Sequence, residues 1–196
     1  MARRLVLFDF DGTLTKKDTL FEFIRFYHGT PRFLFGFLLL SPMLILFKLG
    51  FIKNQKAKEI VLQYFFRNAP VDAFNSKCAL FAKNAIPSLI RPAALIALQK
   101  HIEDGATVVV VSASPENWVS GWCTAWNIAC IATRLKVENN KLTGEIVGKN
   151  CYGPEKVSRV KEALDTDAFT EIYAYGDSSG DKEMLAFAHA PHYRYF

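Results

Sequence analysis

The sequence predicts an α/β fold in which helices cover both faces of a mostly parallel, doubly wound sheet. Short apolar runs without helical periodicity, typical of buried parallel strands, begin near residues 5, 107 and 172. Helical segments separate these runs along the chain. Hydrophobic residues make up 51% of the 196 residues and charged residues 22%, a balance that fits a folded globular protein and excludes a disordered one.

The first half of the chain is predicted to hold one strand followed by helices. Leu5–Phe10 is short and apolar, so we expect a buried strand there. Asp18–Phe26 is expected to be a helix with Asp18 near its start. Residues 54–67 and 71–85 are further helical candidates, the second ending near Pro87.

Phe33–Phe47 is a run of 15 uncharged, mostly apolar residues, broken only by Gly36, Ser41 and Pro42. A helix that spans a membrane needs about 20 apolar residues, so this run is short for that purpose. Because proline interrupts a helix, we expect two helical pieces with a kink or turn at Ser41-Pro42. Two interpretations stay open: a buried helical hairpin, or an interfacial surface that touches a membrane. Basic flanking residues favour the second, namely Arg32, Lys48, Lys53, Lys56 and Lys58.

The second half alternates helices and strands. Arg91–Glu103 is an amphipathic helix with Gly105 just past its end, and Thr107–Val111 is a β-branched strand that ends at Ser112. The remaining expected elements are a helix over Trp118–Trp126, a strand over Ile128–Ala132, a hairpin formed by Arg134–Glu138 and Lys141–Val147, a helix over Lys156–Leu164, a strand over Ile172–Tyr175 and a helix over Lys182–Ala188.

Positive charge is concentrated in the N-terminal third of the chain. The net charge is +5, and residues 1–70 hold 11 Lys/Arg against 5 Asp/Glu, whereas residues 71–196 hold 13 against 14. Such an excess favours an anionic partner, either a phosphorylated substrate or an acidic membrane surface, although a solvated face would look the same. No nucleic-acid-binding module is recognisable, so we predict no nucleic-acid partner.

The cysteines and the N-terminus predict a cytoplasmic location. The four cysteines form no C-x-x-C pair and no cluster with zinc spacing, which is typical of a reduced protein with free thiols. The apolar run that begins at Leu5 is too short for a signal peptide, because Asp9 and Asp11 end it. The apolar Phe33–Phe47 run leaves open a position at the inner face of a membrane.

Polar residues stand where the predicted strands end. Asp9 and Asp11 follow the first strand, Ser112 follows the second, and Gly176–Asp181 follows the fourth, while Lys156 opens the preceding helix. Each feature alone has an ordinary structural explanation as a turn, a helix cap or a surface charge. In open α/β sheets, however, ligands bind outside the carboxyl ends of the strands, so their shared location predicts a functional site.

The residue types at these positions suit phosphoryl transfer. Asp9 and Asp11, with Asp177 and Asp181, provide the oxygen ligands that Mg²⁺ prefers. A carboxylate beside a bound cation can attack phosphorus, so Asp9 is the candidate nucleophile and Asp11 the candidate general acid and base. Two further groups, Ser112 and Lys156, can donate to the phosphoryl oxygens, and Gly12 allows the backbone to bend.

These motifs resemble those of the haloacid dehalogenase superfamily, from Leu5 to Ala188. Phe8–Thr15 resembles its first motif, Val111–Pro115 its second, Lys156 its third and Tyr175–Asp181 its fourth. The resemblance implies a Rossmann-like core and an aspartyl-phosphate mechanism. It also implies a role for each matching residue: Asp9 nucleophile; Asp11 acid and base; Ser112, Ala113, Lys156 and Gly12 phosphate-binding; Asp9, Asp11 through its carbonyl and Asp177 holding Mg²⁺, with Asp181 supporting.

The identity of residue 11 and the position of the long insert narrow the resemblance. Family members that act as dehalogenases lack an aspartate at this place, so Asp11 favours a phosphatase. The long helical insert between Asp11 and Ser112 is similar to subclass IB, the phosphoserine phosphatase-like branch. We therefore expect a catalytic core of residues 1–16 and 88–196 and a small helical cap of residues 17–87, which would close over the site.

The substrate is open between two phosphomonoesters. In phosphoserine phosphatases a glutamate nine residues after the nucleophile helps to bind the substrate; here Asp18 stands there, and Arg25, Arg32 and Arg67 are candidates for the matching arginine. The apolar Phe33–Phe47 run is similar to the bacterial phosphatidylglycerophosphate phosphatase branch, which favours a lipid or other amphiphilic phosphate. From another class, the chain could be a catalytically inactive phosphate-binding module. The sequence does not determine the oligomeric state.

Overall fold

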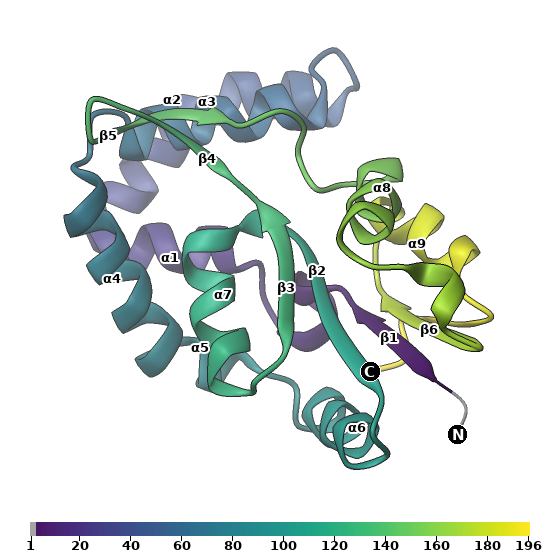
Figure 1. Cartoon of the computed structure of the whole chain (residues 1–196). Helices are drawn as coiled ribbons and strands as arrows, with labels where there is room; N and C mark the ends of the chain where they lie inside the picture. Colours follow the sequence, from purple (N-terminus) through teal and green to yellow (C-terminus); the bar gives the residue numbers. More distant parts are fainter. Residues whose placement is uncertain (1–2) are drawn as a thin grey trace.

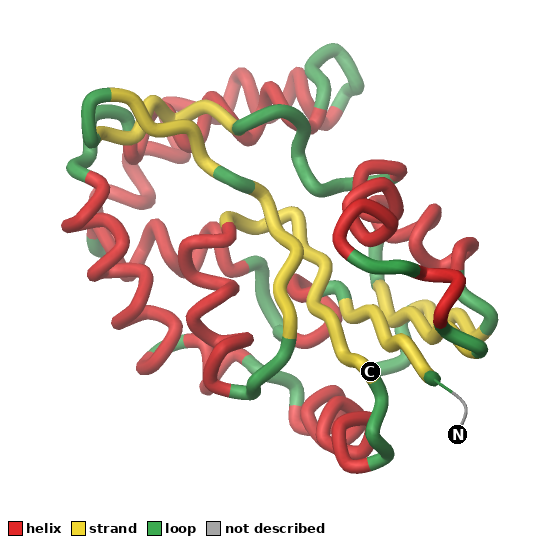
Figure 2. The backbone as a smooth tube through the Cα atoms, in the orientation of Figure 1, coloured by secondary structure: helices red, strands yellow, loops and turns green. Residues whose placement is uncertain are grey.

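The computed structural model describes residues 3–196 and confirms the α/β fold, with a five-stranded sheet at its centre (Figures 1 and 2). The strand order is β3-β2-β1-β6-β7, and every neighbouring pair is parallel. The strands are β1 (Arg4–Phe8), β2 (Thr107–Pro115), β3 (Ala129–Thr133), β6 (Glu171–Gly176) and β7 (Ala190–Tyr193). Because β1 lies in the middle, the segment that follows it reaches the carboxyl edge between β2 and β6.

Helices cover both faces of the sheet because the central strands are apolar on both sides. In β1, Val6 and Phe8 face one hydrophobic cluster, which α6 (Pro92–Glu103) and α7 (Glu116–Ala125) complete. Leu5 and Leu7 face a second cluster, completed by α8 (Pro154–Ala163) and α9 (Lys182–Phe187). This alternation explains the continuous apolar run of the β1 sequence.

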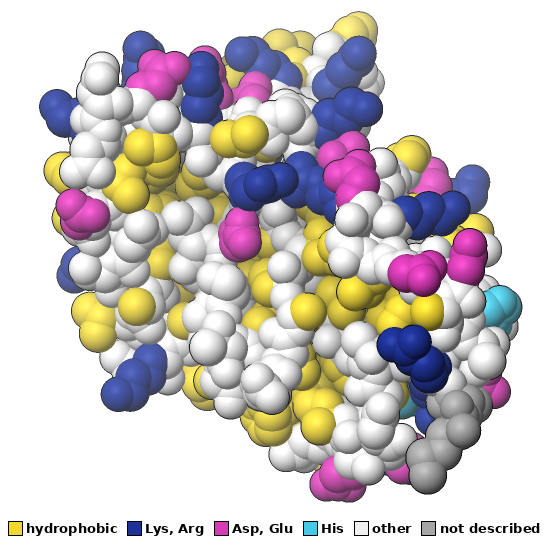
Figure 3. All heavy atoms as spheres, viewed as in Figure 1, with side chains coloured by type: hydrophobic (Ala, Val, Ile, Leu, Met, Phe, Trp, Pro, Cys, Tyr) yellow, Lys and Arg dark blue, Asp and Glu magenta, His cyan; other side chains and the backbone are white. Residues whose placement is uncertain are grey.

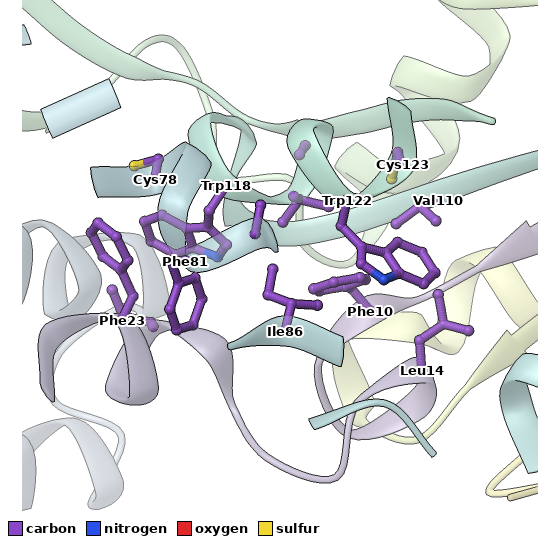
Figure 4. Packing of buried hydrophobic residues seen from close by; sticks show 14 of the residues in the cluster. Phe10, Leu14, Phe23, Cys78, Phe81, Ile86, Val110, Trp118, Trp122 and Cys123 are labelled. Atoms are coloured by element: carbon purple, nitrogen blue, oxygen red, sulfur yellow. The ribbon is translucent and has the colours of Figure 1, made fainter. Parts of the chain in front are cut away.

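The residues between β1 and α6 form a helical layer beside the first cluster. It comprises α1 (Thr19–His28), α2 (Thr30–Lys48), α3 (Asn54–Phe66), α4 (Val71–Asn84) and the short α5 (Ile86–Leu89). Phe23 of α1 is fully buried, and the centroid of its ring lies 4.5 Å from the ring centroid of Trp118 and 5.2 Å from that of Phe81 (Figure 4). The chain enters and leaves this layer at one place, where Thr15 pairs with Ile90.

The two-stranded hairpin β4 (Leu135–Glu138) and β5 (Lys141–Ile146) lies against α3 and not on the central sheet. The backbone N–H of Asn68, just after α3, donates to the carbonyl of Leu142 at 2.8 Å. A Cβ on Gly144 would lie 2.5 Å from the Cα of Gln63, so glycine allows the two backbones to approach this closely. The hairpin therefore belongs by its contacts to the helical layer, which its position in the sequence did not predict.

The expected division into two helical pieces by a turn at Ser41-Pro42 is wrong, because α2 is one helix from Thr30 to Lys48. Pro42 has no N–H for the carbonyl of Leu38, four residues earlier. The hydroxyl of Ser41 donates to that carbonyl at 2.7 Å and satisfies it instead. The serine that was interpreted as part of a turn thus compensates for the proline inside the helix.

Two further differences concern the edge of the sheet and the end of β2. The edge strand β7 was not predicted, because it is short and contains Pro191, which only an edge strand tolerates easily. Strand β2 continues past Ser112 to Pro115, and α7 begins at Glu116, two residues earlier than expected. Ser112 is therefore a strand residue and does not cap a helix.

Candidate active site

Asp9 lies at the carboxyl end of β1 with its carboxylate almost fully buried. Its backbone N–H donates to the carbonyl of Tyr175 in β6 at 2.9 Å, which fixes the start of the following turn. Burial raises the pKa of Asp9 to about 7, although the neighbouring Lys156 ammonium lowers it. An ionised Asp9 is thus stabilised almost entirely by the groups around it and not by water.

Lys156, on the first turn of α8, is the buried cation of the site. Its Nζ donates to Asp9 Oδ1 at 2.5 Å, to Asp181 Oδ1 at 2.6 Å and to the carbonyl of Val111 at 2.8 Å. Burial alone would lower the pKa of Lys156, but the carboxylates of Asp9 and Asp181 outweigh it and hold the pKa above its ordinary value. Lys156 therefore remains charged and joins three elements of the sheet edge.

Asp181 holds the loop after β6 in place. Its Oδ2 accepts from the backbone N–H groups of Asp177 and Ser178 at 3.2 and 3.0 Å, and from the Ser178 hydroxyl at 2.8 Å. Burial would raise the pKa of Asp181, but Lys156 outweighs this and lowers it. Asp181 is therefore a buried, ionised carboxylate that orients Asp177.

Three carboxylates converge into a group that fits a small divalent cation. Single oxygens of Asp9, Asp177 and Asp181 all lie within 4.8 Å of one another. An all-oxygen donor set is what Mg²⁺ prefers, and Mg²⁺ usually takes few protein ligands. Gly12 has φ +84°, and a Cβ there would lie 2.4 Å from Asp177 Oδ2, so only glycine allows Asp177 to approach this close. The residues present thus fit a magnesium ion.

Asp11 points its carboxylate away from this acidic group, into a separate hydrogen-bond network. Its Oδ1 accepts from the N–H of Thr19 at 2.7 Å and from the Thr19 hydroxyl at 2.6 Å. Its Oδ2 accepts from the Ser114 hydroxyl at 2.5 Å. The indole N–H of Trp118 donates to the Thr19 hydroxyl at 3.0 Å and fixes its direction. Asp11 is thus held rigidly while still lining the cavity.

Ser112 and Ala113 lie at the carboxyl end of β2, on the other side of Asp9 from β6. Ser112 is fully buried, and its hydroxyl accepts from the N–H of Ser114 at 2.9 Å. Ala113 and Ser114 line the cavity beside Asp9, whereas Ser112 does not. The structure therefore brings the predicted residues together at one edge of the sheet, with Ser112 behind the surface that a ligand would meet.

A cavity of about 420 Å³ opens above Asp9. Its floor consists of the sheet-edge residues already described. Residues between β1 and α4 contribute much of the remaining lining, namely Lys16, Lys17, Asp18, Leu20, Asn54 and Lys58, and Tyr152 closes another side. The helical layer thus forms one wall of the cavity that contains Asp9.

Asp18 and Lys58 are oppositely charged residues in this wall, close enough for each to affect the pKa of the other. Asp18 caps α1 by accepting from the N–H of Leu20 at 2.8 Å, and limited hydration together with the Asp11 carboxylate raises the pKa of Asp18 to about 6. Lys58 Nζ donates to the carbonyl of Ala113 at 2.8 Å, and burial lowers the pKa of Lys58. This contact links the helical layer directly to the end of β2.

The arginines proposed for substrate binding do not line this cavity. Arg25 lies over the ring of Phe33 and 3.8 Å from Glu22. Arg32 is exposed near the start of α2, and Arg67 lies beside the β4–β5 hairpin. The basic side chains between β1 and α4 that do line the cavity are Lys16, Lys17 and Lys58.

Four residues of the site were not identified from the sequence: Thr13, Thr19, Lys58 and Ser114. Thr13 donates to Asp9 Oδ2 at 3.1 Å and lies 3.4 Å from Asp177 Oδ1. Thr13 and Ser114 lie within the motifs that contain Asp9 and Ser112, so their positions in those motifs could have identified them. Thr19 and Lys58 carried no such signal, because tertiary packing alone brings them to the site.

Comparison with known proteins identifies relatives of this chain. The model of the haloacid dehalogenase-like hydrolase family matches residues 6–186. The protein CicA of Caulobacter vibrioides is 38% identical over 195 residues, which cover 98% of this chain and 86% of that protein. A probable phosphatase of Mycobacterium tuberculosis is 41% identical over 90 residues, which cover 44% of this chain and 31% of that protein.

Solved structures share the fold at lower sequence identity. A Bordetella pertussis protein of unknown function has a TM-score of 0.80 at 21% identity, with 96% of this chain and 88% of that chain covered. A substrate-bound phosphoserine phosphatase has a TM-score of 0.69 at 18% identity, with 96% and 84% covered. The fold of this chain thus recurs in other proteins.

Proposed function

Because the chain belongs to the haloacid dehalogenase-like hydrolase family, we propose that it is a magnesium-dependent phosphatase that hydrolyses a phosphomonoester through a phosphorylated Asp9. The observation that carries this proposal is the position of the Asp9 carboxylate. It lies at the floor of an open cavity, where it pairs with the Lys156 ammonium and forms one acidic group with the carboxylates of Asp177 and Asp181.

In the first step an oxygen of Asp9 attacks phosphorus, and the bond from phosphorus to the ester oxygen breaks. Asp11 gives its proton to that leaving oxygen, so the alcohol departs neutral. The donors Thr19 and Ser114 fix the direction of the Asp11 carboxylate at the wall of the cavity, so it would need little reorganisation to act on the leaving oxygen. Lys156 provides positive charge beside the attacking carboxylate and the phosphoryl oxygens.

In the second step Asp11 takes a proton from water, and the water oxygen attacks the phosphorus of the acyl phosphate. The bond from phosphorus to Asp9 breaks, which releases inorganic phosphate and restores the carboxylate. Asp9, the carbonyl of Asp11 and Asp177 would hold Mg²⁺, with Asp181 supporting, and the bound ion would neutralise charge on the phosphoryl oxygens.

The helical layer supports the proposal of a cap, residues 17–87, over a core of residues 1–16 and 88–196. Five residues of this range line the cavity: Lys17, Asp18, Leu20, Asn54 and Lys58. They surround the space above Asp9, where the alcohol part of an ester would lie. A cap built from these side chains would exclude water and select the leaving group.

We propose a lipid or other amphiphilic phosphate as the substrate, because the apolar helix α2 belongs to the same layer. The alternative is phosphoserine, which the likeness to phosphoserine phosphatase structures favours. Comparing the turnover of phosphoserine with that of a detergent-dispersed lipid phosphate separates them. Efficient turnover of phosphoserine alone would exclude the lipid.

The free thiols of the four cysteines support a cytoplasmic location.

The proposal is tested with an aryl phosphate, with and without Mg²⁺. We expect Asp9→Asn to lower kcat by more than about a thousandfold, since the amide is a far weaker nucleophile. Asp167→Asn, at an exposed aspartate, is the matched control and should leave kcat unchanged. Unchanged turnover in Asp9→Asn would remove Asp9 as the nucleophile. A wild-type protein that binds phosphate without turnover would instead be the catalytically inactive module.

A further inference from the structure

Helix α2 carries an apolar face that nothing in residues 3–196 covers. Leu34, Leu38 and Leu49 are 60%, 69% and 66% exposed, and Phe51 in the following turn is 78% exposed. The other exposed large apolar residues on this face are Phe35, Leu39, Ile45 and Leu46. On α2 these positions span an arc of roughly 140° at 3.6 residues per turn, so they form one continuous stripe. Such a stripe marks an interaction surface.

The opposite face of α2 is fixed to the protein. A Cβ on Gly36 would lie 2.4 Å from the ring of Phe65 in α3, so the two helices are in close contact. The centroid of the Phe37 ring lies 5.5 Å from the ring centroid of Phe65 and 5.2 Å from that of Phe21 in α1. By length and composition alone α2 could cross a membrane. Crossing would require these contacts to break, whereas lying along a surface leaves them intact.

The surroundings of the apolar face are uniformly basic in the sequence. No acidic residue occurs between Glu22 and Glu59. Exposed basic residues stand at the two ends of the stripe and at the start of α3, namely Arg32, Lys48, Lys53 and Lys56. In Figure 3, Lys and Arg side chains lie along the upper edge of the molecule, over α3 and the turn that joins it to α2, and Asp and Glu side chains stand among them toward the left.

We propose that α2 and the α2–α3 turn dock on an anionic lipid surface, with the outer face of α2 lying in the plane of the membrane interface. The apolar side chains would enter the boundary of the acyl chains, while the basic residues pair with lipid phosphates. The body of the protein takes the place of the polar face that an isolated interfacial helix would need.

The charge pattern favours a membrane over a second copy of the chain. A symmetric dimer through this face would bring the basic ends of two stripes together, and no acidic residue between Glu22 and Glu59 is present to compensate them. An anionic bilayer neutralises the same residues. Docking in this orientation also brings the cavity close to the membrane, because Asn54 lines the cavity only three residues after Phe51.

Flotation of the whole protein with phosphatidylcholine vesicles, with and without phosphatidylglycerol, tests the proposal. Wild type should float with the anionic vesicles and bind less as salt rises. Replacing Leu34, Leu38 and Phe51 together by Gln should lower the partition coefficient by at least about tenfold. Ile96→Gln is the control, since the exposed fraction of Ile96, 66%, is similar to those of the replaced residues but Ile96 lies on α6.

Three outcomes would overturn the proposal. Wild type could stay with the vesicle-free fraction at every lipid composition, or the triple variant could bind as wild type does. A dimer in sedimentation that the triple variant abolishes, without vesicle binding, would assign the face to a second copy. Because the replaced side chains are exposed, circular dichroism should match that of wild type. Asp9→Asn should still bind vesicles, so failure of docking and failure of the proposed chemistry are distinguishable.

Discussion

Lys156 donates to Asp9 at 2.5 Å in a part of the protein where both side chains are almost fully buried. Buried charges are costly unless paired, and Lys156 also neutralises Asp181 at 2.6 Å. One ammonium thus pairs with two carboxylates, which follow β1 and β6 in the chain. The site therefore depends on Lys156 for its stability as well as for its proposed chemistry.

Lys156→Met should both inactivate and destabilise the protein. Removing the ammonium leaves Asp9 and Asp181 buried without their cation, which we expect to cost about 3–5 kcal/mol of the free energy of unfolding. Urea denaturation in the absence of Mg²⁺ measures this change. Lys100→Met, at an exposed lysine on α6, should change the free energy by less than about 0.5 kcal/mol. Equal stability of the two variants would contradict the assignment.

Gly12→Ala should weaken Mg²⁺ binding. The added Cβ would meet Asp177 Oδ2 at 2.4 Å, and the backbone at φ +84° disfavours alanine by about 1–2 kcal/mol. We expect the Mg²⁺ concentration for half-maximal activity to rise at least about tenfold, since Asp177 must move. Gly105→Ala is the control, because Gly105 also has a positive φ, +74°, but a Cβ there would meet no atom within 4 Å. It therefore measures the effect of the backbone strain alone. The proposal fails if both variants need the same Mg²⁺ concentration.

Thr19→Val should lower kcat more than it changes KM. The substitution keeps the shape but removes a donor to Asp11 at 2.6 Å and the acceptor of the Trp118 indole N–H. We expect kcat to fall by roughly tenfold to a hundredfold, because Asp11 loses its fixed direction. Steady-state kinetics with an aryl phosphate measures the change, and Thr124→Val on α7 is the control. A rise in KM alone would contradict a role for Thr19 in orienting Asp11.

Acid should destabilise the protein partly through His101. Burial lowers the pKa of His101, whose Nε2 lies 3.0 Å from the Tyr175 hydroxyl and whose buried Nδ1 has no hydrogen-bond partner among residues 3–196. Below the ordinary pKa of about 6.5 the unfolded chain binds a proton that the folded chain does not, so stability falls as the pH falls. His101→Gln should reduce the loss of melting temperature between about pH 7.5 and pH 5.5. An unchanged loss would exclude His101 as a contributor.

The sequence predicted most of the fold because parallel α/β proteins have a strong local pattern. The apolar runs at β1, β2 and β6 are buried on both faces, so hydrophobicity alone locates them. The prediction of two helical pieces at α2 failed because it considered Pro42 without its neighbour Ser41. The Ser41 hydroxyl donates to the carbonyl that Pro42 leaves without a donor. Strand β7 carried too few residues and no apolar run, since an edge strand has less to bury.

What the sequence by itself determined about this protein is which side chains gather at its candidate active site. Asp9, Asp11, Lys156 and Asp177 follow strands or open helices, and parallel strands bring their carboxyl ends to one edge whatever the loops do. Only the tertiary structure decided which partners these residues meet. Thr19 at the start of α1 reaches Asp11, and Lys58 of α3 reaches Ala113, which is 55 residues away, because both helices come to the carboxyl edge of the sheet. Such contacts depend on how side chains fill space between elements, which no local pattern in the sequence records.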